Sequence, residues 1–172
     1  MATNDKQTND SRCHKTTPVN KLETVYQNHI VVQQLQRKIQ KHREENGGQY
    51  PLVGDGGYTQ PEPYCVYVLE CDDPNNLETV DERTKTVWGH TSKKTRAAFH
   101  SWKRFYIGST SNVRQRVLNH LHGTGADFTQ IFSPYELREL RWYGNYSDAQ
   151  NSEQDVAVEY EQKYPDAFIE QI

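Results

Sequence analysis

The stretch FYIGSTSNVRQRVLNH, residues 105–120, decides the fold of this chain. It begins as a short apolar strand, turns through a glycine and small hydroxyl residues, and resumes as a helix that Ser111 or Asn112 can cap. Val113 and Val117 recur at the interval that brings side chains to one helix face, so this face is predicted to pack on the core. The stretch therefore predicts a strand–turn–helix unit.

Two cationic side chains lie on this helix beside the apolar face. Arg116 and His120 have the same spacing as the apolar residues, so they lie along one edge of the stripe. With the strand residue Tyr106 they form a half-buried group that suits a phosphate. A solvated arginine and a surface histidine would give the same pattern, so the spacing alone leaves both interpretations open.

Composition indicates one domain with an appendage. The chain has 172 residues, of which 34% are apolar, a low share for a globular protein. It contains no apolar run long enough to cross a membrane and no apolar core of a signal peptide. Cys13, Cys65 and Cys71 form no even disulfide framework, which favours reduced thiols and an intracellular, cytoplasmic location.

Charge is distributed unevenly along the chain. The net charge is −3, yet residues 83–126 contain no Asp or Glu. This segment holds nine cations: Arg83, Lys85, Lys93, Lys94, Arg96, Lys103, Arg104, Arg114 and Arg116. Such a segment inside an acidic protein is typical of a polyanion site, most commonly one for nucleic acid. An ordinary solvated loop is the alternative.

The chain divides into three parts. Residues 1–20 are polar and predicted to be disordered, and residues 21–63 are predicted to form a helix over 21–45 and a Gly/Pro linker. The apolar stripe of that helix could dock on the domain or pair with a copy of itself in a homodimer. Residues 64–172 are predicted to form an α+β domain with a small antiparallel sheet of about three strands, over 64–71, 104–107 and 135–143, flanked by helices.

The last helix is predicted to begin at Ser152, after a loop over 144–151. Its apolar face is centred on Val156 and Tyr160, which places Glu161 at the edge of that face and Glu159 on the side facing water. Glu161 is therefore the candidate functional carboxylate. A boundary residue with its carboxylate in solvent would fit the geometry equally well.

Several motifs together resemble the GIY-YIG nuclease superfamily. They are Cys65-Val66-Tyr67, Tyr106-Ile107-Gly108, Arg116, His120, the turn Gly123-Thr124-Gly125-Ala126-Asp127-Phe128-Thr129, Ala157 and Glu161. The resemblance covers about residues 64–168. In the first motif Cys65 replaces the glycine and Val66 replaces the isoleucine, and 38 residues separate Tyr67 from Tyr106 where the family has a short hairpin. An insertion at about 72–103, with a short helix near 92–101, is therefore expected.

The resemblance implies a metal-dependent DNA endonuclease that hydrolyses phosphodiester bonds. Glu161 would hold Mg²⁺ or Mn²⁺, Arg116 would bind phosphate oxygens, and Tyr67 and Tyr106 would orient or deprotonate the attacking water. His120 would carry a proton or hold the phosphate. A catalytically inactive DNA-binding or scaffolding module of the same fold is one alternative, and an unrelated nucleic-acid-binding α+β domain is another.

Further residues are predicted to contact DNA. Gly108 would let the backbone approach the substrate. The returning part of the insertion and the strands and helix around it supply the cations Lys93, Lys94, Arg96, Lys103, Arg104 and Arg114. We expect this part to bind the DNA backbone, with a solvated loop or a contact to a partner protein as the alternative.

Overall fold

The structure, a computed structural model, describes residues 19–45 and 64–171. The predicted linker over 46–63 and almost all of the predicted disordered N-terminus lie outside the described residues. Val19 and Asn20 are the exception, because they begin the first helix.

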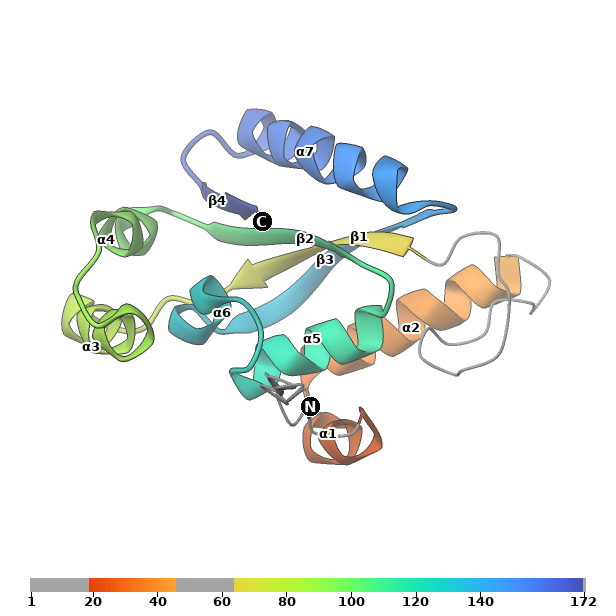
Figure 1. The fold of residues 1–172 in the computed structure, drawn as a ribbon, viewed down its shortest axis with the longest axis horizontal. Helices are drawn as coiled ribbons and strands as arrows, with labels where there is room; N and C mark the ends of the chain where they lie inside the picture. Colours follow the sequence, from red (N-terminus) through yellow and green to blue (C-terminus); the bar gives the residue numbers. More distant parts are fainter. Residues whose placement is uncertain (1–18, 46–63, 172) are drawn as a thin grey trace, which may run out of the picture.

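Seven helices and four strands make up the described part of the chain (Figure 1). They are α1 (Val19–Tyr26), α2 (Ile30–Glu45), β1 (Tyr64–Cys71), α3 (Leu77–Trp88), α4 (Lys93–His100), β2 (Arg104–Thr110), α5 (Val113–His122), α6 (Asp127–Ile131), β3 (Pro134–Tyr143), α7 (Tyr146–Lys163) and β4 (Phe168–Gln171). The predicted α+β class is confirmed.

The strands form one sheet in the order β3-β1-β2-β4. The three predicted strands pair antiparallel, whereas β4, which the sequence analysis missed, runs parallel to β2 and makes the sheet mixed. The strand β1 is buried on both faces, as its continuous apolar run indicated. The partner strand β4 pairs with β2 only along Arg104–Ile107, so β4 does not cover the end of β2 that begins at Gly108.

Helices cover both faces of the sheet (Figure 1). One face packs on α7, through Phe105 and Ile107 of β2. The opposite face packs on α2, α5 and α6, and carries Tyr67 and Tyr106 in the largest apolar cluster. Because side chains alternate along β2, Tyr106 points to the face that α5 covers, while Phe105 and Ile107 point to α7.

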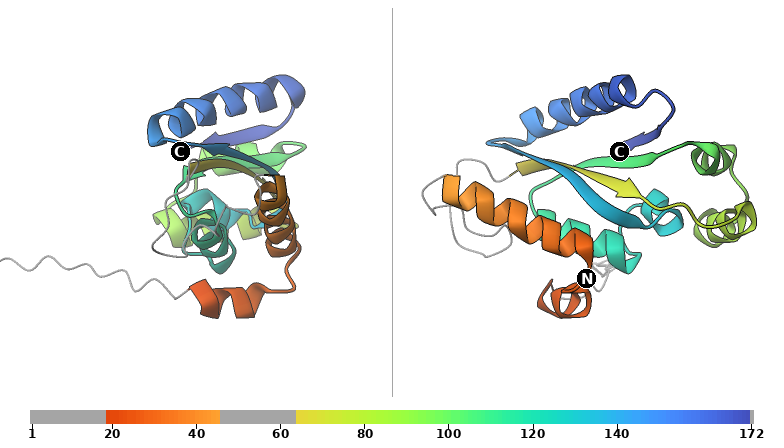
Figure 2. Two further views of the ribbon diagram at one scale, coloured as in Figure 1. Left: turned by 90° about the vertical axis from the view of Figure 1, so that its right-hand side faces the viewer. Right: turned by 180° about the vertical axis from the view of Figure 1, so that it is seen from behind.

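The predicted helix over 21–45 consists of two helices that dock on the domain. The residues that dock α2, Val31, Leu35 and Ile39, are buried in the main core, and Figure 2 shows α2 running beside β3. The side-chain oxygen Oε1 of Gln34 accepts a hydrogen bond of 2.7 Å from the backbone N–H of Leu137 on β3. Of the apolar stripe on which the homodimer hypothesis rested, Leu22, Val32 and Ile39 are buried within the chain, whereas Val25 is exposed.

The predicted insertion folds as a pair of helices, α3 and α4, and so confirms the short helix expected near 92–101. Asn76 caps α3, and Gly89 ends it at φ 78°. The two helices meet where the buried hydroxyl oxygens of Thr84 and Thr95 lie 3.0 Å apart. The segment is a packed unit rather than a long loop.

The last helix, α7, starts six residues earlier than predicted. Asn145 caps it by accepting a hydrogen bond of 2.8 Å from the backbone N–H of Asp148. The extra turns add Ala149 to the buried face of α7, which also carries Glu153. The predicted loop over 144–151 and the predicted capping box at Ser152 are wrong, because the buried Glu153 interrupts the apolar pattern.

Candidate active site

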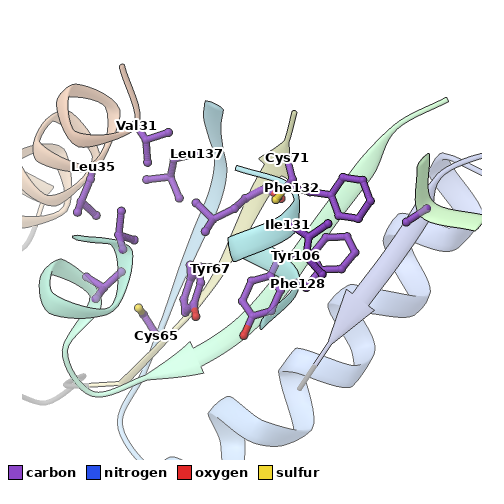
Figure 3. Packing of buried hydrophobic residues seen from close by; sticks show 14 of the residues in the cluster. Val31, Leu35, Cys65, Tyr67, Cys71, Tyr106, Phe128, Ile131, Phe132 and Leu137 are labelled. Atoms are coloured by element: carbon purple, nitrogen blue, oxygen red, sulfur yellow. The ribbon is translucent and has the colours of Figure 1, made fainter. Parts of the chain in front are cut away.

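The site is built on the pairing of β1 with β2. Tyr67 lies directly opposite Gly108 in the antiparallel register. A Cβ atom at Gly108 would lie 2.6 Å from the Tyr67 hydroxyl oxygen, so only glycine leaves room for this tyrosine. Figure 3 shows the Tyr67 and Tyr106 side chains next to each other, with both hydroxyls directed toward the same side. The glycine of the second motif therefore accommodates the tyrosine of the first.

Helix α5 brings Arg116 and His120 to the same hydroxyl. His120 is buried, with 1% of its surface exposed, and its Nε2 lies 2.8 Å from the Tyr67 hydroxyl oxygen. The Nε of Arg116 donates a hydrogen bond of 3.3 Å to that oxygen. Three residues predicted from separate motifs thus meet at one point, and the interpretation of His120 as a surface residue is wrong.

Burial sets the protonation states of this group. Burial, assisted by the nearby Arg116 charge, lowers the pKa of His120 to about 3. Burial also raises the pKa values of Tyr67 and Tyr106, although the Arg116 charge acts in the opposite direction on both. At neutral pH the free site therefore contains a neutral imidazole, two protonated phenols and one guanidinium.

The Tyr106 hydroxyl is buried and makes no hydrogen bond of good geometry among the described residues, although Arg116 and the Tyr67 hydroxyl lie close enough to interact with it. Its ring lies edge-on to the His120 ring, with 4.8 Å between the ring centroids. A buried hydroxyl without a partner costs free energy, so such a group in a native site commonly contacts a bound ligand or water.

A carboxylate that the sequence analysis missed lies close to this hydroxyl. Glu153 of α7 is 7% exposed and has no hydrogen bond or ion pair within residues 19–45 and 64–171. Burial is the main reason that the pKa of Tyr106 is raised, and the nearby Glu153 charge adds to the effect. The signal in the sequence was the position of Glu153, which shares a helix face with Val156, Ala157 and Tyr160.

Glu161, the carboxylate predicted from the sequence, does not join this group. It is exposed and lies two turns further along α7, about 12 Å from Glu153 along the helix axis. Its neighbours Tyr160 and Tyr164 pack on the ring of Phe105 near the start of β2. Gly108 lies toward the opposite end of β2 from Phe105, so Glu161 lies away from the Tyr67 hydroxyl.

The cations predicted to bind DNA are mostly paired within the chain. Ion pairs join Lys94 to Glu170, Arg96 to Asp81, Lys103 to Glu70 and Arg114 to Glu23. Arg104 is buried and donates hydrogen bonds of 2.9 Å to the carbonyl oxygens of Ala98 and Ser101. Lys93 is exposed. Carboxylates from outside the acid-free segment thus neutralise much of its charge.

The fold and the tyrosine–arginine–histidine group define a small α+β domain with a polar site on one face of its sheet. Residues 89–165 match the family model of the GIY-YIG catalytic domain. This match supports the resemblance to the GIY-YIG nuclease superfamily that the sequence motifs indicated. The match begins after β1, so the strand with the altered first motif lies outside it, although Tyr67 meets the matched residues in space. Searches of curated proteins and of solved structures find no significant match.

Among the described residues, no helix is long and apolar enough to cross a membrane.

Proposed function

We propose that this chain is a metal-dependent endonuclease that hydrolyses phosphodiester bonds in DNA. The observation that carries the proposal is the meeting of Tyr67, Arg116 and His120 at one hydroxyl, beside Tyr106 and the buried carboxylate of Glu153. Phosphodiester hydrolysis needs charge neutralisation at the phosphate, a route for the proton of the attacking water, and help for the leaving oxygen. Arg116 can neutralise charge at the phosphate, and Tyr67 with His120 can provide the route for the proton.

The third need is met by a divalent ion, Mg²⁺ or Mn²⁺, which would act as a Lewis acid at the leaving oxygen. Nuclease domains of this superfamily generally use divalent metals. Glu153 takes the place that the sequence analysis gave to Glu161, because Glu153 is buried beside Tyr106 and has no cationic partner among the described residues. A single carboxylate is sufficient, since Mg²⁺ keeps several waters in protein sites.

Arg116 binds the phosphate in this proposal. Its Nε donates a hydrogen bond to the Tyr67 hydroxyl, and no carboxylate among the described residues forms an ion pair with the Arg116 guanidinium. The guanidinium therefore keeps its charge for an incoming anion, and its planar arrangement of donors suits two phosphate oxygens. Arg114, two residues earlier, is tied to Glu23 instead.

Tyr67 and His120 handle the proton in this proposal. Tyr67 gives its hydroxyl proton to Nε2 of His120 as its oxygen takes a proton from the attacking water. The low pKa of His120 opposes this transfer in the free site, because burial and Arg116 both disfavour the imidazolium. A phosphate bound to Arg116 would offset that charge, so proton acceptance would follow substrate binding.

Incubation with supercoiled plasmid DNA and Mg²⁺ tests the function. We expect Glu153→Gln to abolish cleavage while DNA affinity stays nearly unchanged, since the carboxylate would serve the metal rather than the DNA. Glu161→Gln on the same helix is the matched control and should cleave at close to the wild-type rate. Full activity of Glu153→Gln would contradict the assignment.

Binding of DNA by the wild type without cleavage would instead support the alternative of a DNA-binding or scaffolding module. A cytoplasmic location stays a prediction, supported by the two buried free thiols of Cys65 and Cys71.

A further inference from the structure

The short helix α6 contacts two residues of the candidate site. The Thr129 hydroxyl oxygen lies 2.8 Å from Nδ1 of His120, and the backbone N–H of Ala126 donates to the same nitrogen over 3.4 Å. The Phe128 ring stacks on the Tyr106 ring, with 6.4 Å between the ring centroids and 19° between the ring planes. The position of α6 therefore affects where both the imidazole and the phenol lie.

Helix α3 contacts α6 at both of its ends. With only five residues, α6 depends on tertiary contacts to keep its place. At its first residue, Nε1 of Trp88 donates a hydrogen bond of 2.7 Å to the carboxylate of Asp127. At its last residue, Nη1 of Arg83 donates a hydrogen bond of 2.8 Å to the carbonyl oxygen of Ile131, a position where a helix leaves its carbonyl groups without an internal partner.

Apolar packing joins the same two helices. Val80 of α3 is fully buried in the cluster that holds Phe128 and Ile131, and Trp88 packs against this cluster. Figure 1 shows α6 between α3 and α5. The segment that connects β1 to β2 thus supports α6 on the side away from α5.

The link between α3 and His120 is indirect. Among residues 19–45 and 64–171, no hydrogen bond or ring contact joins Arg83 or Trp88 to His120. A cavity of about 410 Å³ lies between α3, α5 and α6 and is bordered by both Arg83 and His120. This space allows α6 to shift when its contacts with α3 are lost, and Thr129 would then move away from His120.

We propose that Arg83 and Trp88 are positioning residues, which hold α6 against the candidate site and thereby fix the His120 and Tyr106 side chains. The effect on cleavage rests on the proposed nuclease function, whereas the effect on the His120 side chain does not. Misplacement of a reacting group by about 1 Å can slow a reaction by about 10²-fold, so these two hydrogen bonds are large enough in their consequence to measure.

The test removes the two donors and keeps most of each side chain. Arg83→Met and Trp88→Phe do this, and Arg83→Lys retains a donor for the Ile131 carbonyl as the rescue variant. Lys85→Met makes the same charge change at an exposed position two residues further along α3. Trp102→Phe removes the indole N–H of a tryptophan with 68% of its surface exposed, so these two changes are the matched controls.

The kcat and KM for cleavage of a labelled DNA duplex with Mg²⁺ are measured at a temperature at which circular dichroism shows every variant to be folded. We expect kcat to fall about 10-fold in Arg83→Met and in Trp88→Phe, and about 10²-fold in the double variant, while KM stays within about twofold. Arg83→Lys, Lys85→Met and Trp102→Phe should keep kcat within about threefold of the wild type.

Spectra of the protein with ¹³C-labelled histidine report on the site without DNA. The ring signal of His120, one of seven histidines, is identified by its loss in His120→Gln. We expect this signal to move from its wild-type position in Arg83→Met and Trp88→Phe, and to stay there in the rescue variant and in both controls.

An unchanged kcat in the double variant would overturn the proposal, and a raised KM beside it would make Arg83 a DNA contact instead. An unmoved His120 signal would also overturn it, as would an equal loss of kcat in the two controls. If the double variant fails to fold, the single variants and Arg83→Lys decide. If the wild type cleaves no DNA, the nuclease proposal fails, and the His120 signal alone decides whether Arg83 and Trp88 position the site.

Discussion

Close approaches at the residue scale explain why the second motif needs its glycine. A Cβ at Gly108 would meet the Tyr67 hydroxyl at 2.6 Å and the ring carbon above it at 2.9 Å. We therefore expect Gly108→Ala to displace the Tyr67 hydroxyl from His120 and to reduce DNA cleavage by at least about 10²-fold. The stability cost of this overpacking should be about 1–3 kcal/mol, measured by urea unfolding.

Gly89→Ala provides the matched control for this change. Gly89 has φ +78° with open space around its Cα, so alanine there costs about 1 kcal/mol of stability through backbone strain and lies away from the site. Its cleavage rate should remain at the wild-type level. Equal loss of activity in both variants would indicate that general destabilisation, rather than the Tyr67 contact, explains the effect of Gly108→Ala.

The buried state of His120 predicts a dependence of stability on pH. Its pKa falls from 6.5 to about 3 on folding, so between these values the unfolded chain binds a proton that the folded chain does not. Stability is therefore retained above about pH 6.5 and lost as the pH falls toward 3. Between pH 7 and pH 5 this residue should cost about 2 kcal/mol.

The measurement compares urea unfolding of the wild type with that of His120→Gln at the two pH values. Other groups titrate alike in both proteins, so the difference isolates His120. We expect the variant to lose about 2 kcal/mol less than the wild type between pH 7 and pH 5. An equal loss in both would show that His120 is charged in the folded protein.

At the element scale, ion pairs change the expectation for DNA binding by the insertion. The sequence suggests that Lys93, Lys94 and Arg96 each contact a phosphate, which would give a salt slope of about 0.9 log units per contact. Because Lys94 is paired with Glu170 and Arg96 with Asp81, we expect their joint replacement by alanine to reduce the slope by about one rather than three.

Fluorescence anisotropy of labelled duplex DNA over a range of NaCl concentrations measures this slope. Lys85→Ala, a single exposed cation on the neighbouring α3, is the control for the removal of one surface charge. A reduction of three units in the triple variant would show that the two ion pairs open when DNA binds. An unchanged slope would place the DNA contacts elsewhere.

The elements also show what could be predicted from the sequence. The strand–turn–helix unit over 105–120 was predictable because its periodicity and its cap are local. The start of α7 was not, because Glu153 is polar at a buried position and hides the helix face that continues to Ala149. The strand β4 is short and gains its pairing from a distant segment, β2, which no local pattern reveals.

The candidate site also combines features that the local sequence predicts with features that only tertiary packing determines. Tyr67, Tyr106, Arg116 and His120 were predicted and their convergence follows from strand register and helix spacing. For the carboxylate, the sequence predicted Glu161, which is exposed, whereas Glu153, two helix turns earlier, is buried near Tyr106. Sequence patterns therefore predict the parts of a site that neighbouring residues determine, while tertiary packing decides the rest.

At the scale of the whole molecule, the N-terminal helices complete the core that supports the site. Leu35 of α2 is buried in the same cluster as Tyr67 and Tyr106, with 2% of its surface exposed. We expect Leu35→Ala to lower the free energy of unfolding by about 3 kcal/mol, because the change leaves a cavity under the sheet. Val25→Ala, on the exposed side of α1, should change it by less than about 0.5 kcal/mol.

Thermal unfolding over a hundredfold range of protein concentration separates docking from dimerisation. If α2 docks within its own chain, the midpoint stays constant for the wild type and shifts down by the same amount at every concentration for Leu35→Ala. If α2 instead joined two chains, the midpoint would rise with concentration by mass action, and Leu35→Ala would steepen that dependence. We expect the constant midpoint, because the apolar residues that a dimer would need, Val31, Leu35 and Ile39, already pack inside the domain.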